Sequence, residues 1–338
     1  MRAAVLGQPI AHSLSPVLHR AAYLACGLTD WRYDAFEVGE ADLAAFLDGL
    51  AAGQWAGLSL TRPLKQVALD LVDHVEPLAA AVGAVNTVLV SPGGLVGANT
   101  DVSGIVQAIE AATLGTGSTT RWQSEVAVQG GPGATAAPAL RPGNSFEVPP
   151  VSRQAAILGG GATAASALAA VGQLGVTQPA VYVRSLARSA ALIQAAARMG
   201  VVPRFHVWPA SPVPDHSPAT VSPHHPLARA ATSHDSVIQP ITSSREDWFA
   251  ADLVISTLPA GAADPLAAAL VGRDLTGQVL LDVAYSPWPP LLARAWSAAG
   301  GLVASGLDML LFQAAEQFRL MTGLAAPLAA MRSALEPV

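Results

Sequence analysis

The chain has 338 residues, of which 51% are hydrophobic and 12% charged, and this length is enough for two domains with apolar cores. A net charge of −6 without any basic block argues against nucleic acid as a partner, and no apolar run reaches the roughly 18 residues of a membrane-spanning helix. Cys26 is the only cysteine, so no disulfide can form within the chain, and we expect a cytoplasmic protein.

Apolar periodicity predicts strands that alternate with helices along most of the chain. Strands are predicted at 3–7, 31–38, 56–61, 87–90, 95–97, 155–158, 180–183, 201–207, 252–257 and 279–283. Helices are predicted at 15–26, 41–52, 162–174, 186–199, 307–322 and 327–335, from Pro63 and Asp101 onward, and after the last two strands. This alternation predicts an α/β fold with parallel sheets.

Two tracts, at 113–152 and 208–245, break this pattern. The first is rich in Gly, Ser, Thr, Pro and Ala and the second in Pro, Ser and His, and neither holds a hydrophobic period, so we interpret both as long irregular insertions. His224 and His225 could suggest a metal site. Prolines surround them and no cysteine is near, so a solvated loop is the better interpretation and we expect no metal.

Lys65 is the only lysine among 18 basic residues; all the others are arginine. A lysine amine can give up and regain a proton, whereas an arginine side chain stays charged. Lys65 is therefore a candidate for acid–base chemistry. A surface lysine that persisted by chance is the alternative, and composition alone does not separate the two.

A glycine-rich turn lies between the predicted strand at 155–158 and the predicted helix at 162–174. Gly159, Gly160 and Gly161, followed by Ala162 and Thr163, fit the pattern Gly-x-Gly-x-x-Ala. Glycines allow a pyrophosphate to approach the backbone, and the helix start supplies N–H groups and partial positive charge. This context predicts a dinucleotide site.

The end of the next predicted strand bears on the choice of cofactor. An NAD site usually has an acidic residue about 20 residues beyond the glycines. This chain instead has Arg184, Ser185 and Arg188, which suit a 2′-phosphate. We therefore predict NADP, although the two arginines could be ordinary solvated charges at a helix start.

Further polar residues follow the predicted strands of the first hundred positions, where parallel sheets place ligands. They are Ser13, Ser15, Ser59, Thr61, Lys65, Asn86, Asn99, Thr100 and Asp101. Hydroxyls, amides, an amine and a carboxylate suit a polyol better than an apolar ligand. Singly, Ser15 and Asp101 could be helix N-caps, Asn86 a turn residue, and Gln313 a partly buried helical residue.

Together these residues form motifs that resemble the shikimate dehydrogenase family, in order and over nearly the whole chain outside the two tracts. The motifs are Gly-x-Pro-Ile-x-His-Ser-x-Ser-Pro at 7–16, Thr-x-Pro-x-Lys at 61–65, Gly-Ala-Val-Asn-Thr at 83–87, Asn-Thr-Asp-x-x-Gly at 99–104, the glycine turn, Arg-Ser-x-x-Arg at 184–188, Asp-Val-x-Tyr-x-Pro at 282–287 and Gly-Leu-x-Met-Leu-x-x-Gln-Ala at 306–314.

The resemblance implies an NADP-dependent enzyme of aromatic amino acid biosynthesis that reversibly reduces 3-dehydroshikimate to shikimate. It implies that Lys65 and Asp101 bracket the reacting hydroxyl and move its proton, either one being the donor. The implied substrate ligands are Ser13 and Ser15 for the carboxylate, Thr61, Asn86 and Gln313 for ring hydroxyls, and Tyr285. The implied cofactor residues are Gly159, Gly160, Gly161, Ala162, Thr163, Arg184, Ser185, Arg188, Thr257, Gly306 and Met309.

The chain departs from the family pattern at several positions. Ser59 and Leu60 stand where Asn and Val are usual, and Val183 replaces an Asn before Arg184. Near the expected nicotinamide, residues 256–261 read Ser-Thr-Leu-Pro-Ala-Gly instead of an Asn-Ala-Thr type of sequence. The Val183 difference bears on how adenosine is held more than on the phosphate contact.

We expect two α/β domains with a cleft between them: a substrate domain of residues 1–103 joined by 307–338, and a Rossmann-type NADP domain of 104–306. The chain would act as a monomer or homodimer. Two alternatives stay open: a quinate or quinate/shikimate dehydrogenase that uses NAD, and a catalytically silent relative that binds shikimate-like ligands.

Overall fold

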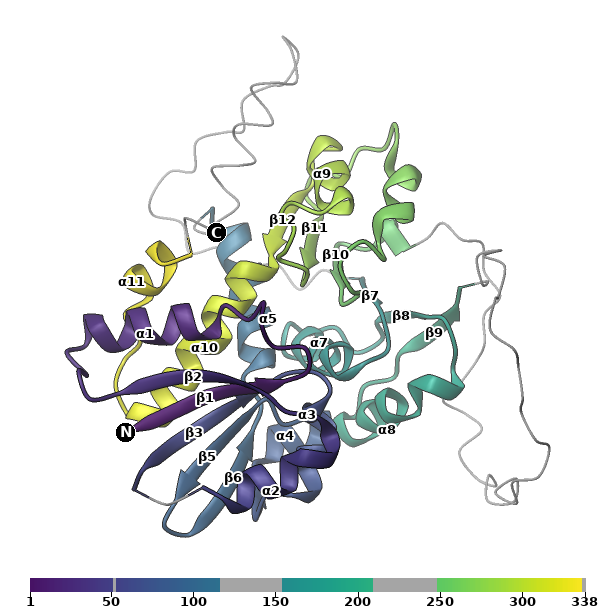
Figure 1. Cartoon of the computed structure of the whole chain (residues 1–338). Helices are drawn as coiled ribbons and strands as arrows, with labels where there is room; N and C mark the ends of the chain where they lie inside the picture. Colours follow the sequence, from purple (N-terminus) through teal and green to yellow (C-terminus); the bar gives the residue numbers. More distant parts are fainter. Residues whose placement is uncertain (51–52, 116–153, 209–247, 336–338) are drawn as a thin grey trace, which may run out of the picture.

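The computed structural model describes residues 1–50, 53–115, 154–208 and 248–335, and within them the chain forms an α/β fold with two six-stranded sheets (Figure 1). The first sheet has the order β2-β1-β3-β5-β6-β4, with β1 (Arg2–Gly7), β2 (Arg32–Glu37), β3 (Trp55–Leu60), β4 (His74–Val75), β5 (Thr87–Ser91) and β6 (Gly94–Ala98). The second has the order β12-β11-β10-β7-β8-β9, with β7 (Ala155–Leu158), β8 (Ala180–Val183), β9 (Arg204–Val207), β10 (Leu253–Ser256), β11 (Val279–Asp282) and β12 (Leu302–Ser305).

The second sheet is parallel throughout, as the alternation of strands and helices predicted. The first sheet is mixed, which corrects the prediction of parallel sheets: β5 runs antiparallel to both β3 and β6. The cause is the tight turn between β5 and β6. Ser91 pairs with Gly94 across a two-residue turn, and so short a connection can join only antiparallel strands.

The two longest helices, α5 (Asp101–Thr113) and α10 (Gly306–Thr322), lie between the sheets and pack on each other (Figure 1). The helices are α1 (Ser15–Ala25), α2 (Leu43–Asp48), α3 (Leu64–Val67), α4 (Pro77–Val82), α5 (Asp101–Thr113), α7 (Ala162–Gln173), α8 (Ala190–Met199), α9 (Leu291–Ala298), α10 (Gly306–Thr322) and α11 (Leu328–Ser333). Helix α5 also contacts α7 and β12, while α10 contacts α1, β3 and β5. Because α5 packs on the second sheet and on α10, and α10 packs on the first, the pair fixes how the two halves face one another.

The strands of the second sheet are buried on both faces, since helices cover each side. All four residues of β7, β10 and β11 are buried, which explains their continuous apolar sequences. The all-alanine and small-residue stretches of α7 allow this helix to lie close to the sheet and to α5. This packing holds the turn between β7 and α7 at one edge of the molecule's interior cleft.

Every predicted strand is present, whereas β4, β12 and α4 were not predicted. β4 has only two residues, too few for a hydrophobic period to show, while β12 and α4 have four and six. The segment Asp264–Leu270, predicted as a helix after β10, is a 3-10 helix. Most of the two tracts at 113–152 and 208–245, with His224 and His225, lies outside the described residues.

Candidate active site

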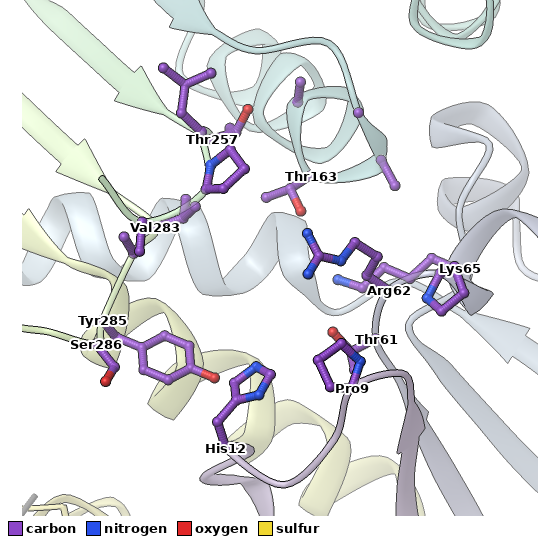
Figure 2. Close-up of a pocket in the computed structure, with 18 of the residues that line it drawn as sticks. Pro9, His12, Thr61, Arg62, Lys65, Thr163, Thr257, Val283, Tyr285 and Ser286 are labelled. Carbon is purple, nitrogen blue, oxygen red and sulfur yellow. The ribbon is translucent and has the colours of Figure 1, made fainter. Parts of the chain in front are cut away.

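Two adjoining cavities, of about 610 and 160 Å³, open between the halves of the molecule (Figure 2). The larger is lined from one side by residues that follow β3 and from the other by the start of α7 and the segments after β10 and β11. The residues that line both cavities are His12, Thr61, Lys65, Thr163, Val283 and Tyr285. The two cavities are therefore compartments of a single cleft.

Lys65 and Asp101 meet where the two compartments join. The Nζ of Lys65 donates a hydrogen bond to Oδ2 of Asp101 at 2.5 Å, and the two side chains are only 15% and 5% exposed. Lys65 lies in the short helix α3 and Asp101 is the first residue of α5. A paired amine and carboxylate with little access to bulk water can exchange a proton with a ligand held against them.

Asn86 holds the second oxygen of the same carboxylate. Its Nδ2 donates to Oδ1 of Asp101 at 2.8 Å and to Oγ1 of Thr100 at 2.9 Å, while its Oδ1 accepts from the backbone N–H of Thr100 at 2.8 Å. Gln313 accepts a longer bond from Asn86, at 3.4 Å. Each oxygen of Asp101 thus has its own donor, which fixes the orientation of the carboxylate.

A chain of buried hydrogen bonds continues from Asn86 to Tyr33, and two of its members, Ser59 and Gln317, also line the smaller compartment. Gln317 donates to the carbonyl oxygen of Asn86 at 3.1 Å and to Oγ1 of Thr87 at 3.0 Å, and Thr87 donates to Oδ1 of Asn86 at 2.9 Å. Ser59 donates to Oε1 of Gln317 at 2.7 Å and accepts from the hydroxyl of Tyr33 at 2.5 Å. We call Tyr33, Ser59, Gln317, Thr87 and Asn86 the buried polar chain.

In the buried polar chain, each residue donates its hydrogen bond to the next residue in the direction from Tyr33 to Asp101. This direction decides which end of each amide faces which neighbour, because an amide turned by half a revolution would set two donors or two acceptors against each other. The Nδ2 of Asn86 must therefore face Asp101. A fully satisfied buried network of this kind makes a side-chain arrangement rigid.

His19 closes the far end of the chain. Its ring is fully buried and stacks on that of Tyr33, with centroids 4.1 Å apart and planes 9° from parallel. Burial lowers the pKa of His19 to about 4, and the nearby Gln317 side chain opposes this only in part. Burial also raises the pKa of the Tyr33 hydroxyl. Both rings are therefore neutral near pH 7.

The smaller compartment brings together the residues expected to bind substrate. Ser13, Ser15, Thr61, Tyr285 and Gln313 all line it, together with Lys65 and Asp101. Asn86 contacts it indirectly, through Asp101. A cavity that presents three hydroxyl-bearing aliphatic side chains, a phenol, an amide, an amine and a carboxylate suits a small polyhydroxylated acid.

The interpretation of Ser15 and Asp101 as N-caps was wrong by one residue. Both are the first helical residue, after Leu14 and Thr100, and neither cap makes a side-chain hydrogen bond to its own helix. The carboxylate of Asp101 is instead engaged by Lys65 and Asn86. A true N-cap would have turned that carboxylate toward the backbone of α5 and away from the cleft.

The glycine turn leaves room for a ligand at the start of α7. Gly159 has a φ of +123°, and a Cβ there would lie 2.3 Å from Oγ1 of Thr257; at Gly160 it would lie 2.7 Å from Oγ of Ser189. At Gly161 nothing stands within 4 Å. No side chain caps α7, so its first N–H groups point at open space. These features fit a dinucleotide pyrophosphate.

The predicted 2′-phosphate residues lie next to this turn, after β8. Arg184 and Arg188 are exposed, and neither forms an ion pair within the described part of the chain. Ser185 accepts a bond from the backbone N–H of Arg188 at 3.5 Å, and its carbonyl accepts one from Ser189 at 2.9 Å. Since Ser189 abuts Gly160, the segment and the turn share one surface.

The remaining predicted cofactor residues divide between the two compartments. Ala162, Thr163 and Thr257 line the larger compartment. Gly306 and Met309 line the smaller one, beside Lys65 and Asp101. A dinucleotide that starts at the glycine turn would therefore end near Met309, at the junction where the lysine and the carboxylate lie.

Sequence reasoning did not single out several residues of the cleft. His12 lines both compartments and Arg62 the larger one, although both stand inside the quoted motifs. Asp282, at the end of β11, is 1% exposed, and burial raises its pKa to about 6 despite a bond from the N–H of Ala284. A polar residue within a buried strand or helix, such as Ser59 or Gln317, was the available signal.

No three histidine, cysteine, aspartate or glutamate side chains in the described ranges gather closely enough to hold a metal ion. No helix in the same part of the chain has both the length and the apolar composition needed to cross a membrane.

Comparison with known proteins places the chain among relatives. Residues 5–88 match the profile of the shikimate dehydrogenase substrate binding domain, and 306–336 match the shikimate 5′-dehydrogenase C-terminal domain. The shikimate dehydrogenase (NADP(+)) of Geobacter sp. strain M21 is 33% identical over 98% of this chain and 93% of its own length. That of Halobacterium salinarum is 34% identical over 98% and 97%.

The chain belongs to the shikimate dehydrogenase family. Its fold agrees with solved members: the crystal structure of Mycobacterium tuberculosis shikimate dehydrogenase gives a TM-score of 0.70 at 33% identity, covering 99% of this chain and 98% of that one. The family resemblance and the two-domain α/β fold predicted from the motifs are thereby confirmed. The roles of the individual residues stay predictions.

Proposed function

We propose that the protein is an NADP-dependent shikimate dehydrogenase, which reversibly reduces 3-dehydroshikimate to shikimate. The relatives named above carry this activity in their names, and a Thermus thermophilus member, 27% identical with a TM-score of 0.67, was solved with NADP(H) and shikimate. The observation in this chain that carries the proposal is the 2.5 Å contact of Lys65 and Asp101 at the junction of the two compartments.

In the proposed mechanism, the glycine turn and Arg184 would hold NADP, which would supply the hydride acceptor for the carbon that bears the reacting hydroxyl. The Lys65–Asp101 pair takes the proton of that hydroxyl and returns it in the reverse reaction. Asp101 keeps the amine of Lys65 directed at the junction, and Asn86 keeps the carboxylate from turning away. The low exposure of both side chains keeps the transferred proton from exchanging freely with bulk water.

The substrate contacts follow the lining of the smaller compartment. Ser13 and Ser15 bind the carboxylate, while Thr61, Asn86 and Gln313 bind ring hydroxyls and Tyr285 closes the compartment. Five of these six residues line the same 160 Å³ space. Their hydroxyl and amide groups match the hydrogen-bonding groups of shikimate, which supports the assignment.

The cofactor contacts follow the larger compartment and its margin. Gly159, Gly160 and Gly161 with Ala162 and Thr163 hold the pyrophosphate, and the open space at Gly161 supports this. Arg184, Ser185 and Arg188 hold the 2′-phosphate. Thr257, Gly306 and Met309 lie along the path to the nicotinamide, as their places in the two compartments suggest.

The test is an assay of NADPH oxidation with 3-dehydroshikimate, run beside NADP and NAD reduction with shikimate and with quinate. We expect turnover with 3-dehydroshikimate and a preference for NADP and shikimate. A preference for NAD and quinate would replace the proposal with the quinate dehydrogenase alternative. Binding of shikimate without any turnover at high enzyme concentration would identify a catalytically silent relative.

We also propose the domain division given above, with residues 1–103 and 307–338 forming the substrate domain and 104–306 the NADP domain. The return of the chain through α10 supports it, since α10 packs on β3 and β5 of the first sheet. Expression of residues 104–306 alone would test it, because this segment should fold and bind NADPH without the substrate domain.

The same proposal extends to location and partners. A single cysteine and a net charge of −6 support a cytoplasmic enzyme that binds small molecules and no nucleic acid. Size-exclusion chromatography with light scattering distinguishes the expected monomer or homodimer from larger assemblies.

A further inference from the structure

Arg62 lies on the cofactor side of the cleft, although it belongs to the loop that carries substrate residues. It follows β3 directly after Thr61 and stands three residues before Lys65. Thr61 and Lys65 line both compartments, whereas Arg62 lines only the larger one. Figure 2 shows its guanidinium extending across that space toward Thr163, at the start of α7.

The positive charge of Arg62 has no negative partner among the described residues. Its guanidinium forms no ion pair and no side-chain hydrogen bond with any residue that the structure describes. Glu40 lines the same compartment without pairing with it, and the carboxylate of Asp101 is already engaged by Lys65 and Asn86. The group that faces Arg62 is the uncapped N-terminus of α7, which carries partial positive charge.

A cation aimed at a positive helix end is unfavourable unless an anion lies between them. The space between them is the 610 Å³ compartment, which also contains the open side of Gly161. We propose that Arg62 binds the pyrophosphate of the dinucleotide from the side opposite the glycine turn. This inference rests on the proposed function, because it names a further contact of the same cofactor.

The substrate carboxylate is a poorer partner for Arg62. The residues proposed for that carboxylate, Ser13 and Ser15, line the smaller compartment, which Arg62 does not line. Arg62 therefore supplies charge to the cofactor and leaves the substrate pocket electrically unchanged. Because Arg62 follows β3 of the first sheet while the glycine turn follows β7 of the second, a pyrophosphate bound by both ties the two sides of the cleft together.

The experiment measures NADPH binding without substrate, by fluorescence titration of the wild type, R62M, R62K and R32M. Methionine keeps much of the side-chain length without the charge. Arg32 is an exposed arginine of the edge strand β2 that lines neither compartment, so R32M is the matched loss of one positive charge. We expect the Kd for NADPH to rise about tenfold in R62M, less in R62K and not in R32M.

The site of contact is tested with a fragment. Adenosine 2′-monophosphate carries the 2′-phosphate but no pyrophosphate, so its affinity should be unchanged in R62M and reduced in R188A. The Kd of R62M for NADPH should also depend less steeply on salt than that of the wild type. Thermal unfolding of each variant shows whether it is folded.

Three results would overturn the inference: equal NADPH affinity of R62M and wild type, equal losses in R62M and R32M, or an equal loss of the fragment and of NADPH in R62M. If the wild type itself fails to bind NADPH, the proposed function has failed instead, and the two failures are distinguishable.

Discussion

The two compartments of the cleft are prepared in opposite ways. In the smaller one, Lys65, Asp101 and Asn86 are already joined by hydrogen bonds of 2.5 and 2.8 Å and stand at the end of a buried chain. At the edge of the larger one, Arg62 and Arg188 are exposed and have no charged partner among the described residues. The polar groups of the smaller compartment already have their partners without a ligand, whereas the charged groups of the larger one would gain theirs from the ligand.

The difference follows from the chemistry proposed for each region. Proton transfer needs donor and acceptor atoms held within tenths of an ångström, so its groups are fixed by neighbours inside a core that excludes water. Binding a highly charged cofactor needs available positive charge and backbone N–H groups, and an arginine already paired would have to give up its partner first. Each prediction below separates these two regions.

The largest effect is expected from Lys65→Ala. Without the amine, the hydroxyl proton has no route through the pair, and general acid–base groups contribute roughly 100- to 10,000-fold to turnover. We expect kcat to fall about 1,000-fold. NADPH should bind with nearly the wild-type Kd, because Lys65 is not among the residues proposed to bind the phosphates of the cofactor. Steady-state rates and fluorescence titration measure the two quantities.

An equal loss of NADPH affinity in that variant would contradict the separation of the two regions. The lysine would then serve the cofactor, and the contrast between a prepared and an open compartment would fail. Arg32→Met, which removes a distant charge, provides the control for a general electrostatic effect.

The next effect is a loss of stability at low pH that comes from His19, which stacks on Tyr33 at one end of the buried polar chain. The pKa of His19 is about 4 when folded and 6.5 when exposed. As pH falls from about 6.5 toward 4, the unfolded chain takes up a proton that the folded chain does not. The free energy of unfolding therefore decreases in this range, by up to about 3 kcal/mol.

Urea unfolding of the wild type and His19→Phe at several pH values tests this. Phenylalanine keeps an aromatic ring beside Tyr33 but does not titrate. Asp282 acts oppositely, because its raised pKa of about 6 makes the fold lose stability as pH rises from about 4 to 6. The informative quantity is therefore the difference between the two proteins, and a difference that does not vary with pH would refute the role of His19.

The sequence was a good guide to this molecule wherever a pattern was long or local. Hydrophobic periods predicted the long elements, and the glycine turn between β7 and α7 could be read from three adjacent residues. It was a poor guide to β4, whose two residues carry no period, and it also missed the four-residue β12. The antiparallel direction of β5 relative to β3 could not be predicted, because the sequence of a hairpin does not show which other strand will pair with it.

The site shows the same limit. Ser59 was noticed as one of the polar residues after a strand and as a departure from a family pattern, but without a role, and Gln317 was not noticed at all. Their contact joins residues 258 positions apart in the chain, so no spacing rule could have predicted it. Arg62 lay within a quoted motif, but its orientation toward the larger compartment is a property of the folded loop.

A smaller effect is expected at the open region from Arg188→Ala. Loss of a charge-assisted bond to the 2′-phosphate should raise KM for NADP about ten- to a hundredfold. KM for NAD, which lacks that phosphate, should hardly change, and kcat with saturating NADP should stay near the wild-type value. An equal rise for both cofactors would mean that Arg188 supports the fold of the loop instead of binding phosphate.

The smallest effect is expected from Gln317→Met, which removes the middle of the buried polar chain while keeping a side chain of similar length. Gln317 touches Asn86 and Ser59 but neither Lys65 nor Asp101, so it is a positioning residue. We expect kcat with shikimate to fall about tenfold, with the Kd for NADPH unchanged, because the Thr87 hydroxyl is no longer fixed by the Gln317 donor and can turn away from Oδ1 of Asn86. Gln107→Met, at a helical glutamine bonded only to Ser103, is the matched control.

A role in stability alone would lower the unfolding temperature of Gln317→Met without changing kcat below that temperature. Thr87→Val separates the two possibilities, since it directly removes the hydrogen bond that Oδ1 of Asn86 accepts from Thr87. If both residues act by orienting Asn86, the double variant should lose little more activity than either single one, because the amide can be released only once. Multiplicative losses would mean that the chain is a set of independent core contacts, and the prepared compartment would then extend no further than Asn86.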